Sequence, residues 1–251
     1  MESILELSDG KQLSYRFNNG SKGLTVVFMH GSLSDKNGAK SLMLEKLCEE
    51  NDVPFVAFDF TGHGESSGEY TDGTIGIWFK DALDIIDRVV VGDVILVGSS
   101  LGGWISLLTA QALPERVKAV IGLAAAADFT KDVWASFSVE QKQEVLDKGV
   151  LYIPNGWTEQ GDPWTKRLFS DAEHFYVLNG EGSLNIDCPV VLIHGKKDDC
   201  VSFKKSFEIM DCLKTDNCKV IVLKNSGHRL ADECDLAVLK QELITLLNKS
   251  E

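Results

Sequence analysis

Short, largely apolar runs recur along the chain, and most of them are followed by a polar residue or a glycine. They are residues 24–29, 54–58, 94–97, 117–123, 190–193 and 219–223. Such runs are typical of strands that are buried on both faces of a sheet. Segments with helical spacing alternate with them, at residues 38–50, 74–90, 101–112, 202–214 and 233–249. The alternation predicts an α/β fold, with a mostly parallel central sheet and helices on both faces.

Two segments depart from this alternation. Residues 2–7 and 12–17 are typical of short strands joined by a turn. Between about residues 128 and 186 no buried strand is evident, and helical pieces are expected around 138–148 and 162–174. This stretch holds three of the five tryptophans, Trp134, Trp157 and Trp164. We therefore expect a single domain over residues 1–251, with a small helical cap inserted at about 128–186.

Charge and hydropathy exclude several classes of partner. The chain has 25 Lys and Arg against 38 Asp and Glu, a net charge of −13. Binding to a phosphate backbone needs clustered basic residues, so we expect no nucleic-acid partner. No stretch approaches the roughly 18–20 apolar residues of a transmembrane helix. The N-terminal segment also lacks the features of a secretory signal. We expect a soluble protein without stable membrane insertion.

The six cysteines do not indicate a metal site. None form a Cys-x-x-Cys pair, and no cluster of cysteine and histidine has the spacing of a zinc site. We therefore predict no metal and no cofactor, and reduced thiols. Cys200 is the cysteine placed for a regulatory role, because it lies beside the candidate acid described below.

The pentapeptide Gly98-Ser99-Ser100-Leu101-Gly102 lies between a predicted buried strand and a predicted helix. A G-x-S-x-G sequence in that context forms a tight turn that exposes the central serine hydroxyl. Glycines are needed there because a Cβ would collide across the turn. Ser100 is therefore the candidate nucleophile, and the Leu101 N–H at the start of the helix can stabilise an oxyanion. The alternative is an ordinary turn of small residues.

A serine hydroxyl needs a general base, and His228 is the candidate. Three histidines follow Ser100: His174, His194 and His228. His228 comes just after the last predicted strand, and catalytic groups gather at the carboxyl ends of strands in such sheets. His194 ends a buried strand and is expected to be a structural turn residue, whereas His174 belongs to the insertion.

The acid that orients the base is expected after the preceding strand. That segment offers Asp198 and Asp199, and we favour Asp198 because it lies four residues past the strand end. Asp128, one strand earlier, is a weaker alternative. A carboxylate in this segment that does not orient His228 is expected to be a solvated turn residue.

The second oxyanion donor is expected in the loop His30-Gly31-Ser32-Leu33. Ser32 N–H is the preferred donor, with Leu33 as the alternative, and His30 is interpreted as a brace for the loop. The glycine-rich segment 59–66 lacks the Gly-Lys-Ser/Thr of a phosphate-binding loop and the spacing of a dinucleotide-binding loop. We interpret it as structural, with His63 as a turn residue.

In this order, these motifs resemble the α/β-hydrolase superfamily over essentially the whole chain. Four segments narrow the resemblance to the α/β-hydrolase domain-containing protein ten family: Gly98–Trp104, Lys148–Val150, His194–Asp199 and His228-Arg229. That family contains mitochondrial acyl-protein thioesterases and acyl-glucuronide esterases, with bacterial relatives. The resemblance implies an α/β-hydrolase fold and a Ser100, Asp198 and His228 triad. Ser202 departs from the proline that many hydrolases have there.

The resemblance also implies a location and a substrate class. The animal members begin with a transit peptide that is not present here, so we expect a cytoplasmic bacterial relative or a trimmed form from the mitochondrial matrix. The expected substrates are small-molecule or acyl-protein esters and thioesters, cleaved through an acyl-enzyme on Ser100. The alternatives are a small-ester carboxylesterase, a monoglyceride lipase, or a non-catalytic binding module on the same fold.

Overall fold

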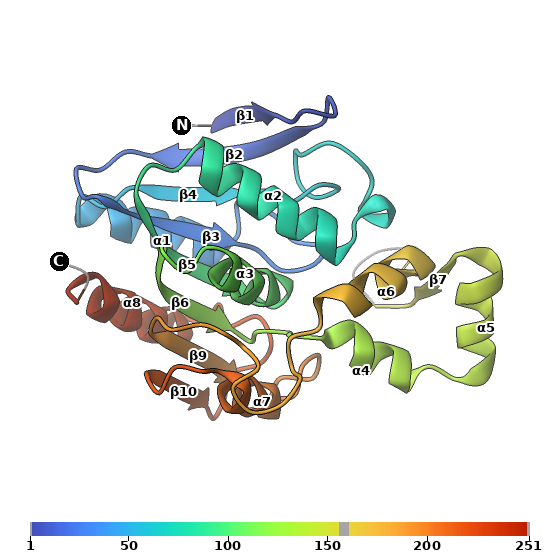
Figure 1. Cartoon of the computed structure of the whole chain (residues 1–251). Helices are drawn as coiled ribbons and strands as arrows, with labels where there is room; N and C mark the ends of the chain where they lie inside the picture. Colours follow the sequence, from blue (N-terminus) through green and yellow to red (C-terminus); the bar gives the residue numbers. More distant parts are fainter. Residues whose placement is uncertain (1, 156–160, 250–251) are drawn as a thin grey trace.

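The computed structural model describes residues 2–155 and 161–249, and its largest element is an eight-stranded sheet. The strands run in the order β1-β2-β4-β3-β5-β6-β9-β10 (Figure 1). Their bounds are β1 Glu2–Glu6, β2 Gln12–Asn18, β3 Leu24–Met29, β4 Phe55–Phe58, β5 Asp93–Ser99, β6 Val117–Leu123, β9 Val190–Gly195 and β10 Cys218–Leu223. The six neighbours β4, β3, β5, β6, β9 and β10 pair in parallel. β2 pairs antiparallel with β1 and β4. The predicted α/β-hydrolase fold is confirmed.

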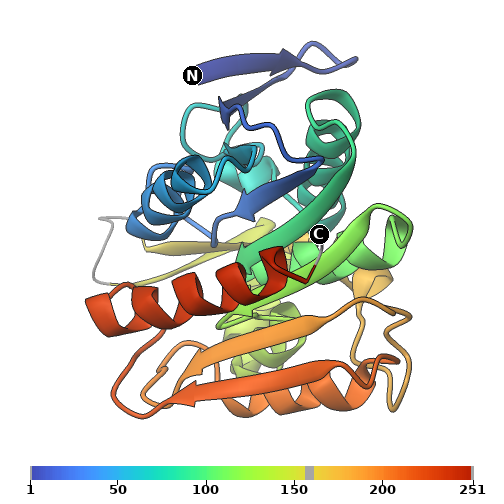
Figure 2. The same ribbon diagram turned by 90° about the vertical axis from the view of Figure 1, so that its left-hand side faces the viewer.

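Helices cover both faces of this sheet. α1 (Ala39–Glu50) and α8 (Glu233–Leu247) pack on one face, and Figure 2 shows α8 lying across the strands. α2 (Ile75–Arg88), α3 (Leu101–Ala112) and α7 (Lys204–Cys212) pack on the other face. Within β3, Val26 packs with the first group of helices and Val27 with the second, and both are fully buried. Burial on two faces explains why the strands are continuous apolar runs rather than alternating ones.

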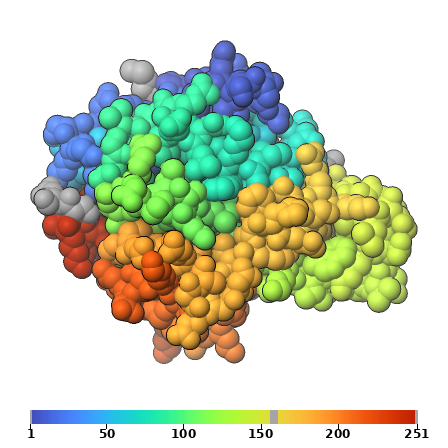
Figure 3. All heavy atoms as spheres, viewed as in Figure 1, coloured from blue at the N-terminus to red at the C-terminus, as the bar shows by residue number. Residues whose placement is uncertain are grey.

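The cap between β6 and β9 projects from one side of the molecule (Figures 1 and 3). Its elements are α4 Phe129–Ser136, α5 Val139–Lys148, β7 Val150–Ile153, β8 Asp162–Thr165, α6 Lys166–Ala172 and the 3-10 turn η2 Glu173–Phe175. The expectation of a helical cap is therefore wrong in part, because β7 and β8 pair as an antiparallel hairpin. Each strand has four residues, too few for a clear alternation, and Pro163 is tolerated because an edge strand need not donate at every position. Trp157 lies outside the described residues.

Aromatic side chains form the core of the cap. Trp164 stacks on Phe169, and Trp134 and Phe137 pack against Phe169 in turn. These residues join Val145 and Leu151 in a small cluster, and Trp164 also packs against one of the two cores of the sheet. Trp134 and Trp164 thus have a packing role in holding the elements of the cap together.

Polar contacts attach the cap to the sheet. Asp128, the residue before α4, accepts hydrogen bonds from the amides of Val177 and Leu178 at 2.9 and 3.0 Å. The Asp171 carboxylate accepts from the Gly76 amide at the start of α2, at 2.8 Å. Asp128 is therefore occupied in joining the two ends of the insertion, which removes it as an alternative acid.

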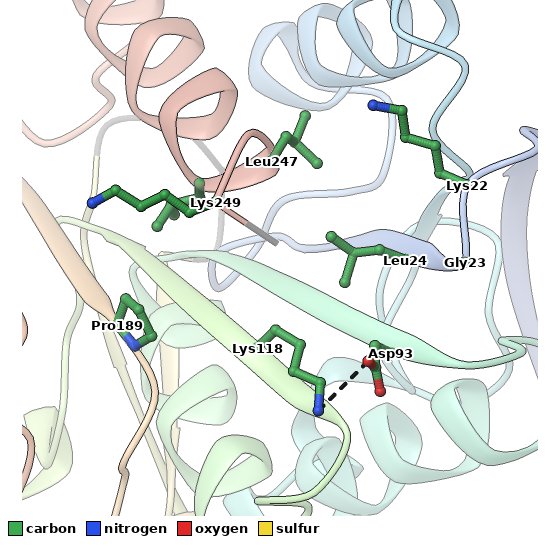
Figure 4. A pocket seen from close by; sticks show the side chains of 9 residues that line it. Lys22, Gly23, Leu24, Asp93, Lys118, Pro189, Leu247 and Lys249 are labelled. Carbon is green, nitrogen blue, oxygen red and sulfur yellow. Dashed lines mark ion pairs between the residues drawn. The ribbon is translucent and has the colours of Figure 1, made fainter. Parts of the chain in front are cut away.

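A hollow of about 680 Å³ lies at the amino ends of the parallel strands (Figure 4). Its lining includes Leu24, the first residue of β3, and Asp93, the first residue of β5, which pairs with Lys118. Ser100 follows the other end of β5, so this hollow is a full strand length away from the candidate site. Among residues 2–155 and 161–249, no helix is long and apolar enough to cross a membrane.

Candidate active site

Ser100 occupies a sharp turn between β5 and α3. Its backbone angles are φ 53° and ψ −115°, in a region that non-glycine residues rarely adopt and that marks functional turns. A Cβ on Gly98 would lie 2.1 Å from the Gly102 carbonyl oxygen, and one on Gly102 would lie 2.2 Å from the Met29 carbonyl oxygen. Both glycines of the pentapeptide are therefore required by close backbone approach, as predicted from the sequence.

Backbone hydrogen bonds over-determine this strained turn. The Ser100 amide donates to the Leu123 carbonyl at 2.8 Å, and the Ser100 carbonyl accepts from the Ala126 amide at 3.1 Å. The neighbouring strand β6 and the segment after it thus hold the turn from one side. These hydrogen bonds fix the backbone of Ser100, and so help to set the position of its hydroxyl.

His228 lies 3.1 Å from the Ser100 hydroxyl, measured from Nε2 to Oγ. Its Nδ1 lies 2.8 Å from Oδ2 of Asp198. Because an ionised carboxylate only accepts, Nδ1 carries the ring hydrogen and donates it to Asp198. Nε2 then keeps its lone pair, which faces the Ser100 hydroxyl. This tautomer is the one that a general base for serine requires.

The loop that carries His228 is held next to the loop that carries Asp198. A Cβ on Gly195 would lie 2.3 Å from the Ser226 carbonyl oxygen, so Gly195 is what allows the close approach. The Lys197 amide donates to that same carbonyl at 2.9 Å, and the Ser226 hydroxyl donates to Asp235 on α8. Backbone contacts between the two loops therefore fix the position of His228 relative to Asp198.

Asp198, rather than Asp199, is the carboxylate that meets His228. Its side chain is fully buried, and Oδ1 accepts hydrogen bonds from the amides of Cys200 and Val201. Burial alone would raise the pKa of Asp198, but hydrogen bonds from His194, His228 and the Val201 amide outweigh it and hold that pKa well below its usual range. Asp199 is exposed, and its Oδ1 lies 3.6 Å from the Cys200 thiol.

The sequence prediction missed the contribution of His194. It was expected to be a structural turn residue, but its Nε2 donates to Oδ2 of Asp198 at 3.0 Å and approaches the Val201 carbonyl at the same distance. Its Nδ1 accepts from the Ser206 hydroxyl at 2.8 Å. The side chain is fully buried. The spacing His194-x-x-x-Asp198 at a strand end was the available signal, because that turn brings the two side chains together.

The loop after β3 lies against Ser100. A Cβ on Gly31 would be 3.3 Å from the Ser100 Cβ, so the backbone of this loop approaches the serine closely. Within the described ranges, the amides of Ser32, Leu33 and Leu101 find no hydrogen-bond acceptor. Unpaired N–H groups beside a candidate nucleophile are what an oxyanion site requires.

Tyr70 fixes the side chain of Ser32, a contact that the sequence did not indicate. Their hydroxyls share a hydrogen bond of 2.6 Å between residues 38 positions apart. Tyr70 belongs to the 3-10 turn η1 (Tyr70–Asp72), and burial raises its pKa to about 12. Its hydroxyl is therefore neutral at physiological pH and is available to hold Ser32 in place.

Two buried histidines connect the loop after β3 to the glycine-rich segment. His30 donates through Nδ1 to the Gly31 carbonyl at 2.7 Å and accepts from the Phe60 amide through Nε2 at 3.2 Å. This is the bracing role predicted for it. His63 packs between the rings of His30 and Tyr70, and burial lowers its pKa to about 3. His63 is thus a buried neutral ring rather than a simple turn residue.

The fully buried Asp59 organises the glycine-rich segment. Its carboxylate accepts hydrogen bonds from the amide and the ammonium group of Lys36 and from the amide of Glu65. A Cβ on Gly64, which has φ +50°, would collide with the Asp59 carboxylate. The loop is therefore packed around an internal ion pair, which agrees with the structural interpretation of this segment.

A fold of this topology with a serine, a histidine and an aspartate at its strand ends defines a class of protein. The chain belongs to the alpha/beta hydrolase family, whose family model matches residues 26–241. It is therefore a hydrolase of that family.

Named relatives narrow the comparison. The chain is 38% identical to the human mitochondrial palmitoyl-protein thioesterase ABHD10, over 98% of this chain and 80% of the relative. The solved structure of mouse alpha/beta hydrolase domain-containing protein 10 matches with a TM-score of 0.92 and 34% identity, over the whole of both chains. A putative hydrolase from Agrobacterium vitis S4 matches with a TM-score of 0.92 and 26% identity, over 98% of both chains. The predicted resemblance to this family is confirmed.

Proposed function

We propose that the protein is a serine hydrolase that cleaves carboxylic thioesters or esters through an acyl-enzyme on Ser100. The observation that carries the proposal is the hydrogen-bonded chain from Ser100 Oγ through His228 to Asp198, with heavy-atom distances of 3.1 and 2.8 Å. It satisfies the requirement that nucleophile, base and orienting acid lie within hydrogen-bond reach of one another. A binding module on the same fold would not need this arrangement.

In the first step, His228 Nε2 accepts the Ser100 proton while Oγ attacks the substrate carbonyl. The imidazolium that forms is stabilised by Asp198, which stays ionised. His228 then gives the proton to the leaving thiolate or alkoxide, and the acyl group remains on Ser100. In the second step, His228 takes a proton from water, and the resulting attack on the acyl-enzyme releases the carboxylic acid and restores the Ser100 hydroxyl.

We assign the oxyanion site to the amides of Ser32 and Leu101. The absence of a partner for either amide among the described residues supports this assignment, as does the close approach of Gly31 to Ser100, where an added Cβ would lie 3.3 Å from the Ser100 Cβ. Each donor of this kind stabilises the tetrahedral intermediate by roughly 3–4 kcal/mol in comparable sites.

The proposed substrate is the thioester of a long-chain acyl group on a protein cysteine. Relatives at 34–38% identity are named palmitoyl-protein thioesterase, which supports this choice. Aromatic packing also continues from the serine turn into the cap. Trp104 on α3 packs on Phe129 with ring centroids 5.6 Å apart, and Phe129 packs on Trp164. These rings make the junction between the serine turn and the cap apolar, an environment that suits an acyl chain better than a polar alcohol.

The test is kcat/KM over matched thioester and oxyester series with acetyl, octanoyl and palmitoyl groups, because this ratio reports discrimination in the transition state. We expect kcat/KM to rise with chain length and to be greater for the thioester of each pair. Ser100→Ala is expected to abolish hydrolysis, and Ser99→Ala serves as the matched control. A maximum at the acetyl oxyester would contradict the substrate assignment and favour a small-ester carboxylesterase, and activity confined to monoglycerides would favour a lipase.

A further inference from the structure

A cysteine thiol lies beside the histidine and aspartate of the candidate site. Cys200 is exposed and belongs to the same loop as Asp198, and its amide donates to Oδ1 of Asp198 at 2.9 Å. The sulfur of Cys200, a ring nitrogen of His228 and a carboxylate oxygen of Asp198 all lie within 4.8 Å of one another. A second carboxylate, that of Asp199, lies 3.6 Å from the sulfur. Three potential ligand groups therefore meet at one place, and a fourth, the Asp199 carboxylate, lies beside the sulfur.

The combination of donors selects a class of metal ion. Thiolate, imidazole and carboxylate are the three side-chain ligands of Zn²⁺, which takes four of them in tetrahedral geometry. Hard cations such as Mg²⁺ and Ca²⁺ prefer all-oxygen sites and gain little from sulfur. The two neighbouring carboxylates add negative charge that attracts a divalent cation. Ligand atoms up to 4.8 Å apart need only side-chain adjustment to reach a common ion, since Cys200 is exposed and its side chain can rotate.

We propose that Cys200, Asp198 and His228 form an inhibitory binding site for Zn²⁺, with Asp199 as the fourth ligand group. On binding, the Cys200 thiol loses its proton to solvent and the thiolate coordinates the metal. No other group of three or more histidine, cysteine and acidic side chains with ligand atoms this close occurs in residues 2–155 and 161–249.

Coordination at this place is incompatible with the proposed catalysis. If the metal takes Nε2 of His228, the lone pair that accepts the Ser100 proton is occupied. If it takes Nδ1, the single ring hydrogen of neutral imidazole moves to Nε2, which then cannot accept a proton either. Binding of Zn²⁺ does not depend on the proposed function, whereas the inhibitory consequence rests on it.

The chain supplies a matched control for the thiol. Cys234 is also exposed, and its sulfur lies 3.7 Å from a carboxylate oxygen of Asp235. It has an acidic neighbour but does not belong to the cluster with a histidine. A serine at either position removes an exposed thiol next to an aspartate, and only the change at Cys200 removes a proposed ligand.

The experiment measures Zn²⁺ binding by titration calorimetry and, separately, hydrolysis over a range of Zn²⁺ concentrations in the native protein, Cys200→Ser, Cys234→Ser and Ser100→Ala. We expect the native protein and Cys234→Ser to bind one Zn²⁺ and to lose hydrolysis over the same concentration range. Cys200→Ser should bind Zn²⁺ roughly tenfold or more weakly, with inhibition shifted by the same factor relative to its own zinc-free rate. Ser100→Ala should bind Zn²⁺ as the native protein does.

Equal binding by Cys200→Ser and Cys234→Ser would overturn the site, and so would a native enzyme that binds Zn²⁺ without losing activity. These results are distinct from failure of the proposed function. If the native protein hydrolyses no ester or thioester, calorimetry on the two cysteine variants still decides whether the metal site exists.

Discussion

His194 and His228 both donate hydrogen bonds to one oxygen of Asp198, Oδ2, at 3.0 and 2.8 Å. The other oxygen, Oδ1, accepts from the amides of Cys200 and Val201. Four donors therefore surround a carboxylate whose side chain is fully buried. A carboxylate held in this way has a fixed orientation and a strong preference for the ionised form, and both properties are what an acid that orients a catalytic histidine requires.

The first prediction concerns the choice between the two neighbouring aspartates. We expect Asp198→Asn to lower kcat by about 10³- to 10⁴-fold, because an amide can donate to Nδ1 and so favours the wrong tautomer of His228. Asp199→Asn removes an exposed carboxylate and should lower kcat only slightly. Steady-state kinetics of the two variants on one thioester give the comparison, and equal losses would contradict the assignment of Asp198.

The second prediction concerns stability at low pH. Because its hydrogen bonds hold the pKa of Asp198 below the value of 3.8 expected for an unperturbed aspartate, the unfolded chain takes up the proton at higher pH than the folded protein does. The stabilisation by ionised Asp198 is therefore complete above the unfolded pKa and is lost as pH falls below it. The native protein should lose more unfolding free energy than Asp198→Asn does between about pH 5 and pH 2.

Urea unfolding at several pH values measures this difference, and Asp199→Asn is the matched variant. The unfolding free energy of Asp199→Asn should vary with pH as that of the native protein does, since within residues 2–155 and 161–249 no hydrogen bond or ion pair joins Asp199 to either histidine. A pH dependence for Asp198→Asn that is identical to the native one would show that Asp198 is not held in its ionised form.

The third prediction concerns Tyr70 as a positioning residue for the oxyanion loop. Tyr70→Phe and Ser32→Ala each remove the hydrogen bond between the two hydroxyls, which in such pairs contributes about 1 kcal/mol. We expect each variant to lower kcat about fivefold at an unchanged KM, because in the proposed mechanism the amide of Ser32 acts only when the oxyanion forms. A purely structural effect would change the unfolding free energy without this separation of kcat from KM.

The double variant Tyr70→Phe with Ser32→Ala tests whether the two hydroxyls act together. Since the same hydrogen bond is lost in each single variant, the double variant should be no slower than the slower single one. Losses that multiply would mean that Tyr70 and Ser32 contribute to hydrolysis independently, and the positioning role would be wrong.

The parts of the fold that could be predicted from the sequence are those with strong periodicity. Val94–Val97 and the glycines after it predicted a buried strand and a serine turn, because the apolar run and the need for close backbone approach are local properties. The carboxyl ends of β5, β9 and β10 meet at one edge of the sheet, so the expected order of serine, acid and histidine already implied proximity. Ser100, Asp198 and His228 lie close together mainly because the parallel strands that precede them end on the same side of the sheet.

The remaining features depend on contacts that local pattern does not encode. The strands β7 and β8 have four residues each, too few for a clear alternation, and a proline such as Pro163 is unfavourable in most strand positions. The Tyr70 hydroxyl meets Ser32 across 38 residues of chain. The choice between Asp198 and Asp199 also depends on the loop conformation, because the Asp198 side chain is buried and the adjacent Asp199 is exposed.

The central proposal, that Ser100 is the nucleophile and His228 its base, is tested most directly by reaction with a fluorophosphonate and mass mapping of the adduct. We predict one adduct per chain on the peptide that contains Ser100, lost in Ser100→Ala and retained in Ser99→Ala, with labelling of His228→Ala slowed by orders of magnitude. An adduct that persists in Ser100→Ala, or that maps to another residue, would contradict the proposal, as would a native protein that does not react at all.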